Sequence, residues 1–176
     1  MASKRGRRAR FCRRNLIRWL YYFESSPVTA DETLLHSIPN TQDYYKHEMG
    51  VWAVSPMAFK PHPKRDIDGM SFFREDFTIP RKLAKESRHP NGVRVCNLTV
   101  VQLRSFQLEA VADPDPNELP GHCIVPKLKY VKKLTPEERQ WVKKISADLA
   151  LRATANGVYS PAGLPSPFPS PNAPHT

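Results

Sequence analysis

Proline is the residue that most restricts what this chain can fold into. The 176 residues contain 18 prolines and only 7 glycines. Because proline holds φ near about −65° and lacks an amide hydrogen, it bends or ends helices and strands. We therefore expect short elements joined by rigid loops, which disfavours an all-α bundle. The length and a hydrophobic content of 40% fit one domain with a buried core.

Short apolar runs bounded by turn residues predict the strands. The segment 51–59 begins as a strand and is cut by Pro56, which fits a bend or a sheet edge. Residues 70–73 and 122–125 are expected to form two further short strands. The segment 31–35 can form either a brief helical turn or an extended piece.

The stretch from 93 to 112 predicts a strand, a helix and a second strand. Its first part, 93–98, alternates apolar and polar residues. Thr99 and Gln102 then form a capping-box pattern ahead of a helix of about two turns, and 108–112 returns to a strand pattern. A right-handed parallel crossover is one arrangement of such a unit, but the helix is short for it.

Two more helices are expected. One begins at Pro80, where the missing amide hydrogen costs nothing, and extends to about Ser87. The second is long and follows Thr135, whose capping box is completed by Glu138, and it stops at Gly157. Its expected buried stripe consists of Trp141, Val142, Ile145 and Leu149.

These patterns predict an α+β fold with a small mixed twisted sheet, short helices and a long C-terminal helix, flanked by disordered ends. We expect a basic N-terminal arm at 1–23, a single α+β domain at 24–157 and a disordered proline-rich tail at 158–176. Within the arm, 11–23 can form a short helix with one apolar stripe.

The positive charge is concentrated in the arm. Removing the arm's eight cations from the formal net charge of +10 leaves +2 for the rest of the chain. Dense arginine favours contact with a polyanion, either nucleic acid or anionic lipid, and the alternative is a solvated tail. The arm's predicted nucleic-acid-binding residues are Arg5, Arg7, Arg8, Arg10, Arg13, Arg14 and Arg18, beside Lys4.

A second basic cluster surrounds Tyr130 and Trp141. Cations interleaved with aromatic side chains can follow a phosphate backbone and stack on bases. If Trp141 packs in the core as the helical stripe predicts, the lysines are instead an ordinary solvated face. The lysines assigned to nucleic-acid binding are Lys132, Lys133, Lys143 and Lys144, with Lys127, Lys129 and Arg139 nearby.

Cysteine use indicates a reducing compartment. Cys12, Cys96 and Cys123 are far apart and form no C-x-x-C pair, which disfavours a disulfide scaffold or a thiolate zinc site. Cys96 and Cys123 are expected to be buried on strands. The apolar run 16–23 is too short for a membrane span. We expect a cytoplasmic protein, although a cleaved signal or transit segment within 1–30 stays open.

Familiar catalytic motifs, such as nucleotide-binding glycine loops, are missing from the sequence. The candidate catalytic residues are Ser71, Arg74, Glu75 and His122, which flank two predicted strands. Arg74 suits a phosphate or carboxylate, and Glu75 or His122 suits proton transfer. The alternatives are a surface ion pair at the strand end and a structural histidine.

A metal site is not predicted, and neither is a cofactor. His62, Asp66 and Asp68 are residue types that bind divalent ions, but their spacing matches no defined metal-binding loop.

The middle half of the chain resembles a loose group of small uncharacterised bacterial proteins. The shared elements are S-x-x-A-F at 55–59, M-S-x-x-R at 70–74, the unit at 93–112, and P-G-H at 120–122. The resemblance implies a shared fold and carries no established activity.

Three functions follow as hypotheses. The first is an accessory protein that binds nucleic acid or a nucleoprotein assembly through its Arg-rich arm. The second is a nucleotide- or RNA-directed enzyme, toxin-like or defence-associated, with an Arg/Glu/His pocket. The third is an interaction subunit recruited to a protein partner through its N-terminal helix and proline-rich tail.

Overall fold

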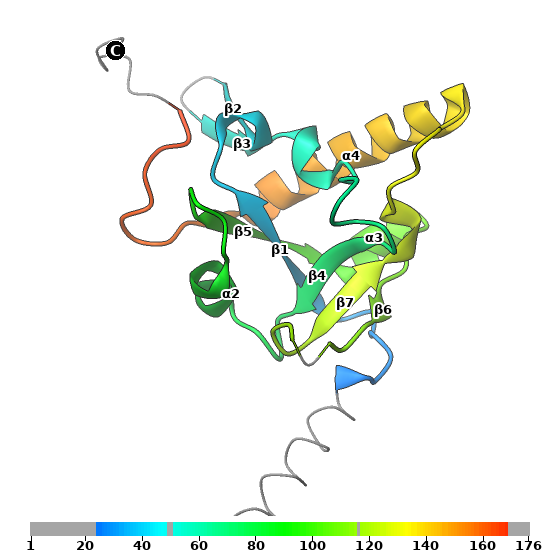
Figure 1. Ribbon diagram of the computed structural model, residues 1–176, viewed down its shortest axis with the longest axis horizontal. Helices are drawn as coiled ribbons and strands as arrows, with labels where there is room; N and C mark the ends of the chain where they lie inside the picture. Colours follow the sequence, from blue (N-terminus) through cyan, green and yellow to red (C-terminus); the bar gives the residue numbers. More distant parts are fainter. Residues whose placement is uncertain (1–23, 49–50, 116, 169–176) are drawn as a thin grey trace, which may run out of the picture.

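A computed structural model describes residues 24–48, 51–115 and 117–168 (Figure 1). The Arg-rich arm and the helix expected at 11–23 lie outside these residues. Within them the secondary structure is strands, short helices and one long helix, which confirms the predicted α+β class.

The main sheet has six strands, and every pairing within it is antiparallel. The prediction of a mixed sheet is therefore wrong, because the main sheet contains no parallel pairing among the described residues. The strands follow the spatial order β6 (Val111–Ala112), β7 (His122–Val125), β4 (Met70–Arg74), β1 (Thr33–Pro39), β5 (Val93–Thr99) and β8 (Val158–Tyr159).

The predicted strand–helix–strand unit forms, but it is not a compact crossover. Helix α3 (Val100–Ser105) follows β5 directly and carries the expected capping box of Thr99 and Gln102. Strands β5 and β6 run in the same direction because four antiparallel steps separate them in the sheet. Three strands therefore lie between the two ends of the unit.

A smaller sheet joins β2 (Tyr45–Glu48) and β3 (Val51–Val54). Pro56 ends the extended segment, as expected, and begins the 3-10 helix η2 (Pro56–Phe59). The other 3-10 turns are η1 (Gln42–Tyr44) and η3 (Pro126–Leu128). Helix α4 supports the small sheet, because the Thr154 hydroxyl accepts the Val54 amide hydrogen at 2.9 Å.

The two remaining helices begin where the sequence predicts. Helix α2 (Pro80–Glu86) has proline in its first turn. Helix α4 (Pro136–Asn156) has a complete capping box of Thr135 and Glu138, and Gly157 ends it with φ of 91°. That dihedral angle lies in the region where glycine avoids the steric cost of a Cβ.

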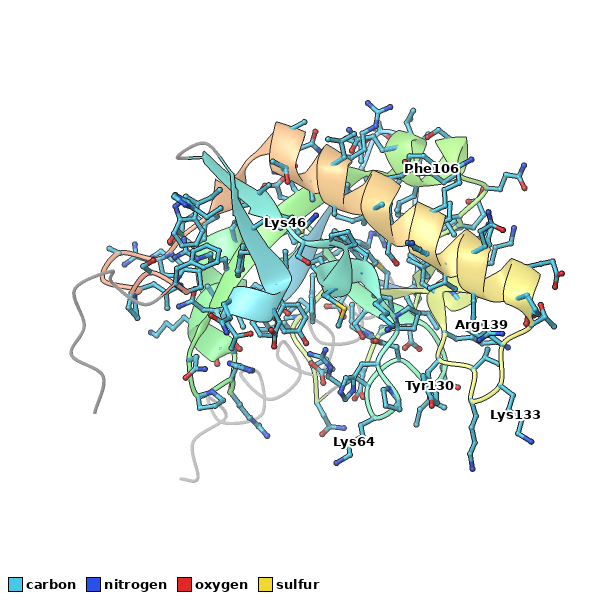
Figure 2. The ribbon with its side chains drawn as sticks, turned by 90° about the horizontal axis from the view of Figure 1, so that it is seen from above. Lys46, Lys64, Phe106, Tyr130, Lys133 and Arg139 are labelled. Atoms are coloured by element: carbon cyan, nitrogen blue, oxygen red, sulfur yellow. The ribbon has the colours of Figure 1, made fainter. Side chains whose placement is uncertain are left out.

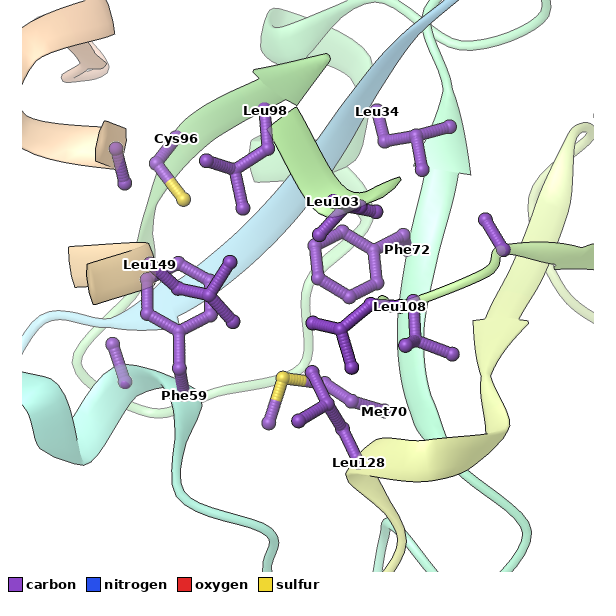
Figure 3. Packing of buried hydrophobic residues seen from close by; sticks show 14 of the residues in the cluster. Leu34, Phe59, Met70, Phe72, Cys96, Leu98, Leu103, Leu108, Leu128 and Leu149 are labelled. Atoms are coloured by element: carbon purple, nitrogen blue, oxygen red, sulfur yellow. The ribbon is translucent and has the colours of Figure 1, made fainter. Parts of the chain in front are cut away.

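The sheet is covered on both faces. On one face, η2, α3 and α4 bury a large apolar cluster, in which Phe72 lies between Leu103 and Leu108 (Figure 3). On the other face, α2 covers a smaller cluster of Leu35, Phe73, Leu83 and Val95. Each fully buried leucine or phenylalanine stabilises the fold by about 1.5–3 kcal/mol relative to exposure.

Cys96 and Cys123 are buried free thiols on β5 and β7, as the sequence predicts. Burial raises the pKa of each thiol to about 12. Both groups therefore act as small apolar side chains at neutral pH.

The tail differs from its prediction over residues 158–168, where disorder was expected. Strand β8 pairs with β5, and the carbonyl oxygen of Pro165 accepts hydrogen bonds from Asn40 at 3.1 Å and Arg94 at 3.2 Å. The Phe168 ring lies 4.8 Å from that of Trp52. Backbone pairing and one aromatic anchor thus order a segment whose composition suggests disorder. Residues 169–176 lie outside the described chain.

Candidate functional site

Strand β1 is paired unequally with its two neighbours. Its register with β5 runs the full strand, from Thr33↔Thr99 to Pro39↔Val93. Its register with β4 covers two positions, ending at Leu35↔Phe73. Beyond that point the two strands diverge, as Figure 1 shows, and we call the resulting gap the sheet opening.

His36 fills the inner part of the sheet opening. Its Nδ1 lies 2.9 Å from the Ser71 carbonyl oxygen and its Nε2 lies 3.1 Å from that of Ala58. The ring also lies 5.0 Å from the Phe72 ring and 5.3 Å from that of Phe59. His36 thus bridges two strands at the point where their ladder stops.

The protonation state of His36 follows from its surroundings. Burial lowers the pKa of the imidazole below its ordinary value, although the two carbonyl oxygens act in the opposite direction. A neutral imidazole has one N–H, so only one of the two carbonyl contacts is a hydrogen bond at neutral pH. With both nitrogens against the backbone, His36 is a structural element of the cavity wall.

A cavity of about 200 Å³ occupies the rest of the sheet opening. Ser71 and His122, two of the predicted catalytic residues, line it together. They lie on one face because Ser71 is paired with Ile124, two residues from His122, and side chains alternate along a strand. Other polar lining residues are Ser37, Tyr44, Lys60, Arg65, Asp66 and Glu118.

His122 has a fixed orientation in this cavity. Its Nδ1 lies 2.7 Å from the Asp113 carbonyl oxygen and 3.4 Å from the Asp113 carboxylate. Because both groups are acceptors, Nδ1 carries a hydrogen and Nε2 of the neutral ring is an acceptor. Every fully buried side-chain nitrogen or oxygen among the described residues has a hydrogen-bond partner. His122 Nε2 has no partner among these residues, so it is not fully buried and reaches solvent.

Arg74 lies outside the cavity. Its guanidinium is buried, with 4% of the residue exposed, and it forms an ion pair with Glu32 in which Nη2 donates to Oε1 at 2.9 Å. It also donates to the carbonyl oxygens of Glu24 and Ser26. Side-chain alternation in β4 places Arg74 on the opposite face from Ser71. Its donors hold the beginning of the described chain.

Glu75 is also separate from the cavity. It follows β4, its side chain is exposed, and its amide donates to the Thr33 carbonyl oxygen at 3.0 Å. The structure therefore brings together two of the four candidate catalytic residues, Ser71 and His122. Sequence reasoning missed His36 and Asp113, because their roles depend on strand separation and on a loop conformation.

In the loop after η2, the potential metal ligands His62 and Asp66 form hydrogen bonds within the loop itself. The Asp66 carboxylate accepts the His62 amide hydrogen at 2.6 Å, and His62 Nδ1 accepts that of Lys64 at 3.2 Å. Among the described residues, no group of three or more histidine, cysteine, aspartate or glutamate side chains is placed to hold a metal ion.

The same loop meets the lysine-rich segment that precedes α4. The Tyr130 amide donates to the Asp66 carbonyl oxygen at 2.6 Å. We call residues 60–69 and 126–148 together the basic end. Figure 2 shows Lys64, Tyr130, Lys133 and Arg139 at this end of the molecule.

Cations outnumber carboxylates at the basic end by ten to five. Since residues 24–176 as a whole carry +2, the basic end carries +5 and the rest carries −3. In the described part of the chain, none of the ion pairs involves Lys132, Lys133, Lys143 or Lys144. These four predicted nucleic-acid-binding lysines are all exposed.

Two aromatic side chains are exposed among these cations. Trp141 is 37% exposed and Tyr130 is 36% exposed. The prediction that Trp141 belongs to the buried stripe is wrong, because the inward face of α4 starts four residues later. Its buried residues are Ile145, Ser146, Leu149, Ala150 and Ala153.

An apolar groove of about 360 Å³ separates η2 from the first half of α4. Pro56, Met57, Leu134 and Val142 contribute its apolar surface. Lys60, Arg139 and Lys143 also line it. Lys60 therefore borders both this groove and the sheet opening.

Comparison with protein-family models, curated proteins and solved structures gave no match. The resemblance to the loose bacterial group thus stays a prediction. Among the described residues, the helices are too short or too polar to cross a membrane.

Proposed function

We propose that this protein binds nucleic acid, free or within a nucleoprotein assembly, through the basic end together with the Arg-rich arm. The observation that carries the proposal is the exposure of Trp141 and Tyr130 among lysines that form no ion pairs within the described chain. Paired lysines or a buried tryptophan would have favoured an ordinary solvated face.

The chemistry of the basic end suits a single strand better than a duplex. Lysine and arginine neutralise phosphates and release counterions, which provides affinity without sequence readout. Exposed aromatic rings stack on unpaired bases and contribute about 1–3 kcal/mol per base. The apolar groove beside Arg139 and Lys143 offers a further surface for a base.

The proposal is tested by the salt dependence of binding. Fluorescence anisotropy of labelled single-stranded RNA and DNA should give a Kd that rises steeply with salt. Changing Lys143 and Lys144 to glutamine should lower the salt slope by about 0.7 for each phosphate that the variant no longer neutralises. Deleting residues 1–18 should lower the slope further.

Trp141→Ala separates stacking from charge. We expect it to weaken binding of a single strand about tenfold, with the salt slope unchanged. Lys82→Gln and Lys85→Gln on α2 are matched controls, because both lysines are exposed and neither lines the apolar groove or the cavity. Absence of binding at low salt, or equal losses of affinity in the control variants, would contradict the proposal.

The tail contacts bear on the alternative of a recruited subunit. Residues 158–168 already contact the body through β8, Arg94 and Trp52. A partner that reads this proline-rich segment would first have to displace it. We therefore favour nucleic-acid binding over recruitment through the tail.

A further inference from the structure

The sheet opening adjoins the surface that we propose for the strand. Lys60 lines both the apolar groove and the cavity. Arg65 lines the cavity from the same loop, and the hydrogen bond from Tyr130 to Asp66 joins this loop to the basic end. A strand that follows the basic end would thus pass the mouth of the cavity.

The cavity contains polar groups that can accept hydrogen bonds from the hydroxyls of a ligand. His122 Nε2 is an acceptor in the neutral ring, because Nδ1 donates to Asp113. The Ser71 and Ser37 hydroxyls have no hydrogen-bond partner among the described residues, so both reach solvent. Three polar groups around the cavity therefore lack protein partners and can meet a polyhydroxylated molecule.

Two of the four charged side chains that line the cavity are cations and can pair with a phosphate. Lys60 and Arg65 are exposed where they line the cavity. Of the two carboxylates there, Asp66 already accepts the His62 amide hydrogen, while Glu118 is exposed. Sugar hydroxyls at His122 and the serines, with a phosphate at Lys60 and Arg65, satisfy both sets of groups.

The volume limits the ligand to one such unit. At about 200 Å³ the cavity is smaller than the pockets of roughly 300–1,000 Å³ that hold drug-sized ligands. A single sugar phosphate fits this space, whereas several nucleotides do not. The rest of a strand would lie outside, on the basic end.

We propose that the sheet opening binds one phosphorylated ribose, with a ribose hydroxyl donating to His122 Nε2 and the phosphate paired with Lys60 and Arg65. This inference rests on the proposed function and extends it to a preference for RNA, since DNA lacks the 2′-hydroxyl. The same chemistry is present in a strand of RNA and in a free ribonucleotide.

The test compares a single-stranded RNA with the DNA of the same sequence. We expect the protein to bind RNA about tenfold more tightly, which corresponds to one hydrogen bond. In His122→Asn, the amide nitrogen can still donate to the Asp113 carbonyl, but the Nε2 acceptor is removed. The RNA preference should fall to near one, with DNA binding unchanged. Circular dichroism and thermal unfolding check that this variant folds.

Ser71→Ala provides a second variant on the same wall and should also reduce the RNA preference. Arg65→Gln and Lys64→Gln form a matched pair, because both side chains are exposed and adjacent in sequence, but only Arg65 lines the cavity. Arg65→Gln should lower RNA affinity more than Lys64→Gln does. Equal effects of the two would overturn the phosphate assignment.

Free nucleotides separate this inference from the proposed function. Uridine 3′-monophosphate and its 2′-deoxy form are titrated into the protein by calorimetry. If the ribose form binds, and binds more weakly to His122→Asn, the result supports the proposed ribose site in the cavity. If RNA and DNA bind equally to the unaltered protein, the inference fails and the proposed function stands. If neither strand binds, the proposed function fails, and the nucleotide titration alone decides whether the cavity binds a phosphorylated ribose.

Discussion

The two sides of β1 differ in how completely they are paired. Toward β5 the ladder is continuous over the whole strand, and toward β4 it stops after Leu35. The paired side is sealed by Cys96, Leu98 and Val95, which are buried on β5. The other side exposes polar side chains to the cavity of the sheet opening.

The difference shows how a small sheet can provide both a rigid scaffold and a polar cavity. A continuous ladder leaves no room for a ligand. Where the ladder stops, backbone groups must find other partners, and His36 meets two carbonyl oxygens at that point. Stability should therefore depend on the paired positions of β1, which include Leu34 and Leu35 toward β4, and ligand binding on the unpaired part beyond Leu35.

The largest expected effect is at the last paired position of β4. Arg74→Met removes the cation from a buried ion pair and leaves the Glu32 carboxylate without its charge partner. Loss of one partner of a buried pair costs about 3–5 kcal/mol. Chemical denaturation should show this loss, and a change below about 1 kcal/mol would contradict the role of the pair.

The same pair predicts a pH dependence. Burial alone would raise the pKa of Glu32, but the hydrogen bonds from Arg74 and Thr29 and the charge of Arg74 lower it below its ordinary 4.5. A lowered pKa stabilises the fold above about pH 4.5, and this stability is lost as pH falls through the folded-state pKa. In Arg74→Met the hydrogen bonds and the charge of Arg74 are lost while the burial effect and the Thr29 hydrogen bonds remain, so the loss of stability on acidification should become smaller. Denaturation over the acid range, from about pH 3 to neutrality, distinguishes the two slopes.

A smaller effect is expected within the continuous ladder. Cys96→Ser places a hydroxyl among the apolar side chains that surround this thiol, and it should cost about 2 kcal/mol. In a Cys12→Ser background, both buried thiols should react with a thiol reagent only at the rate of unfolding, because burial raises the pKa of each to about 12. Fast labelling of Cys96 would show that this side of β1 opens locally.

Arg94 tests the outer edge of the paired side. It donates to Asn40, Ser160 and the Pro165 carbonyl oxygen, and its guanidinium lies 5.1 Å from the centre of the Trp52 ring. Arg94→Ala should destabilise the fold by about 1–2 kcal/mol. It should also make residues 160–168 accessible to limited proteolysis, and unchanged protection would show that β8 and Phe168 hold the tail alone.

The smallest stability effect is expected on the open side. Ser71→Ala removes a hydroxyl that has no partner among the described residues, so stability should change by less than about 0.5 kcal/mol. Its effect should appear in the RNA preference instead. A destabilisation of more than about 1 kcal/mol would show that the hydroxyl supports the strand.

Local patterns predicted the elements that carry strong local signals. The capping boxes at Thr99 and Thr135 and the prolines at 56, 80 and 136 each fix a boundary through neighbouring residues. The segment 31–35 was left open between a helical turn and an extended piece, because the central place of β1 in the sheet comes from pairing with distant strands.

The site was less accessible to sequence reasoning. Ser71 and His122 were found because both border apolar strands, and the register of β4 with β7 brings them to one cavity. Arg74 has the same local signal, but side-chain alternation turns it to the other face, where Glu32 meets it from 42 residues away. Trp141 was misplaced because its helical spacing continues the apolar stripe beyond the part of α4 that contacts the sheet.

Apart from the eight cations of the arm, the uneven charge of residues 24–176 gives this part of the chain an electric dipole moment. With +5 at the basic end and −3 elsewhere in residues 24–176, the field of a polyanion would rotate the protein before contact. Encounters would then begin with the basic end foremost, which raises the association rate. Because the Debye length shrinks to about 8 Å at physiological ionic strength, this orienting effect acts only in the final approach.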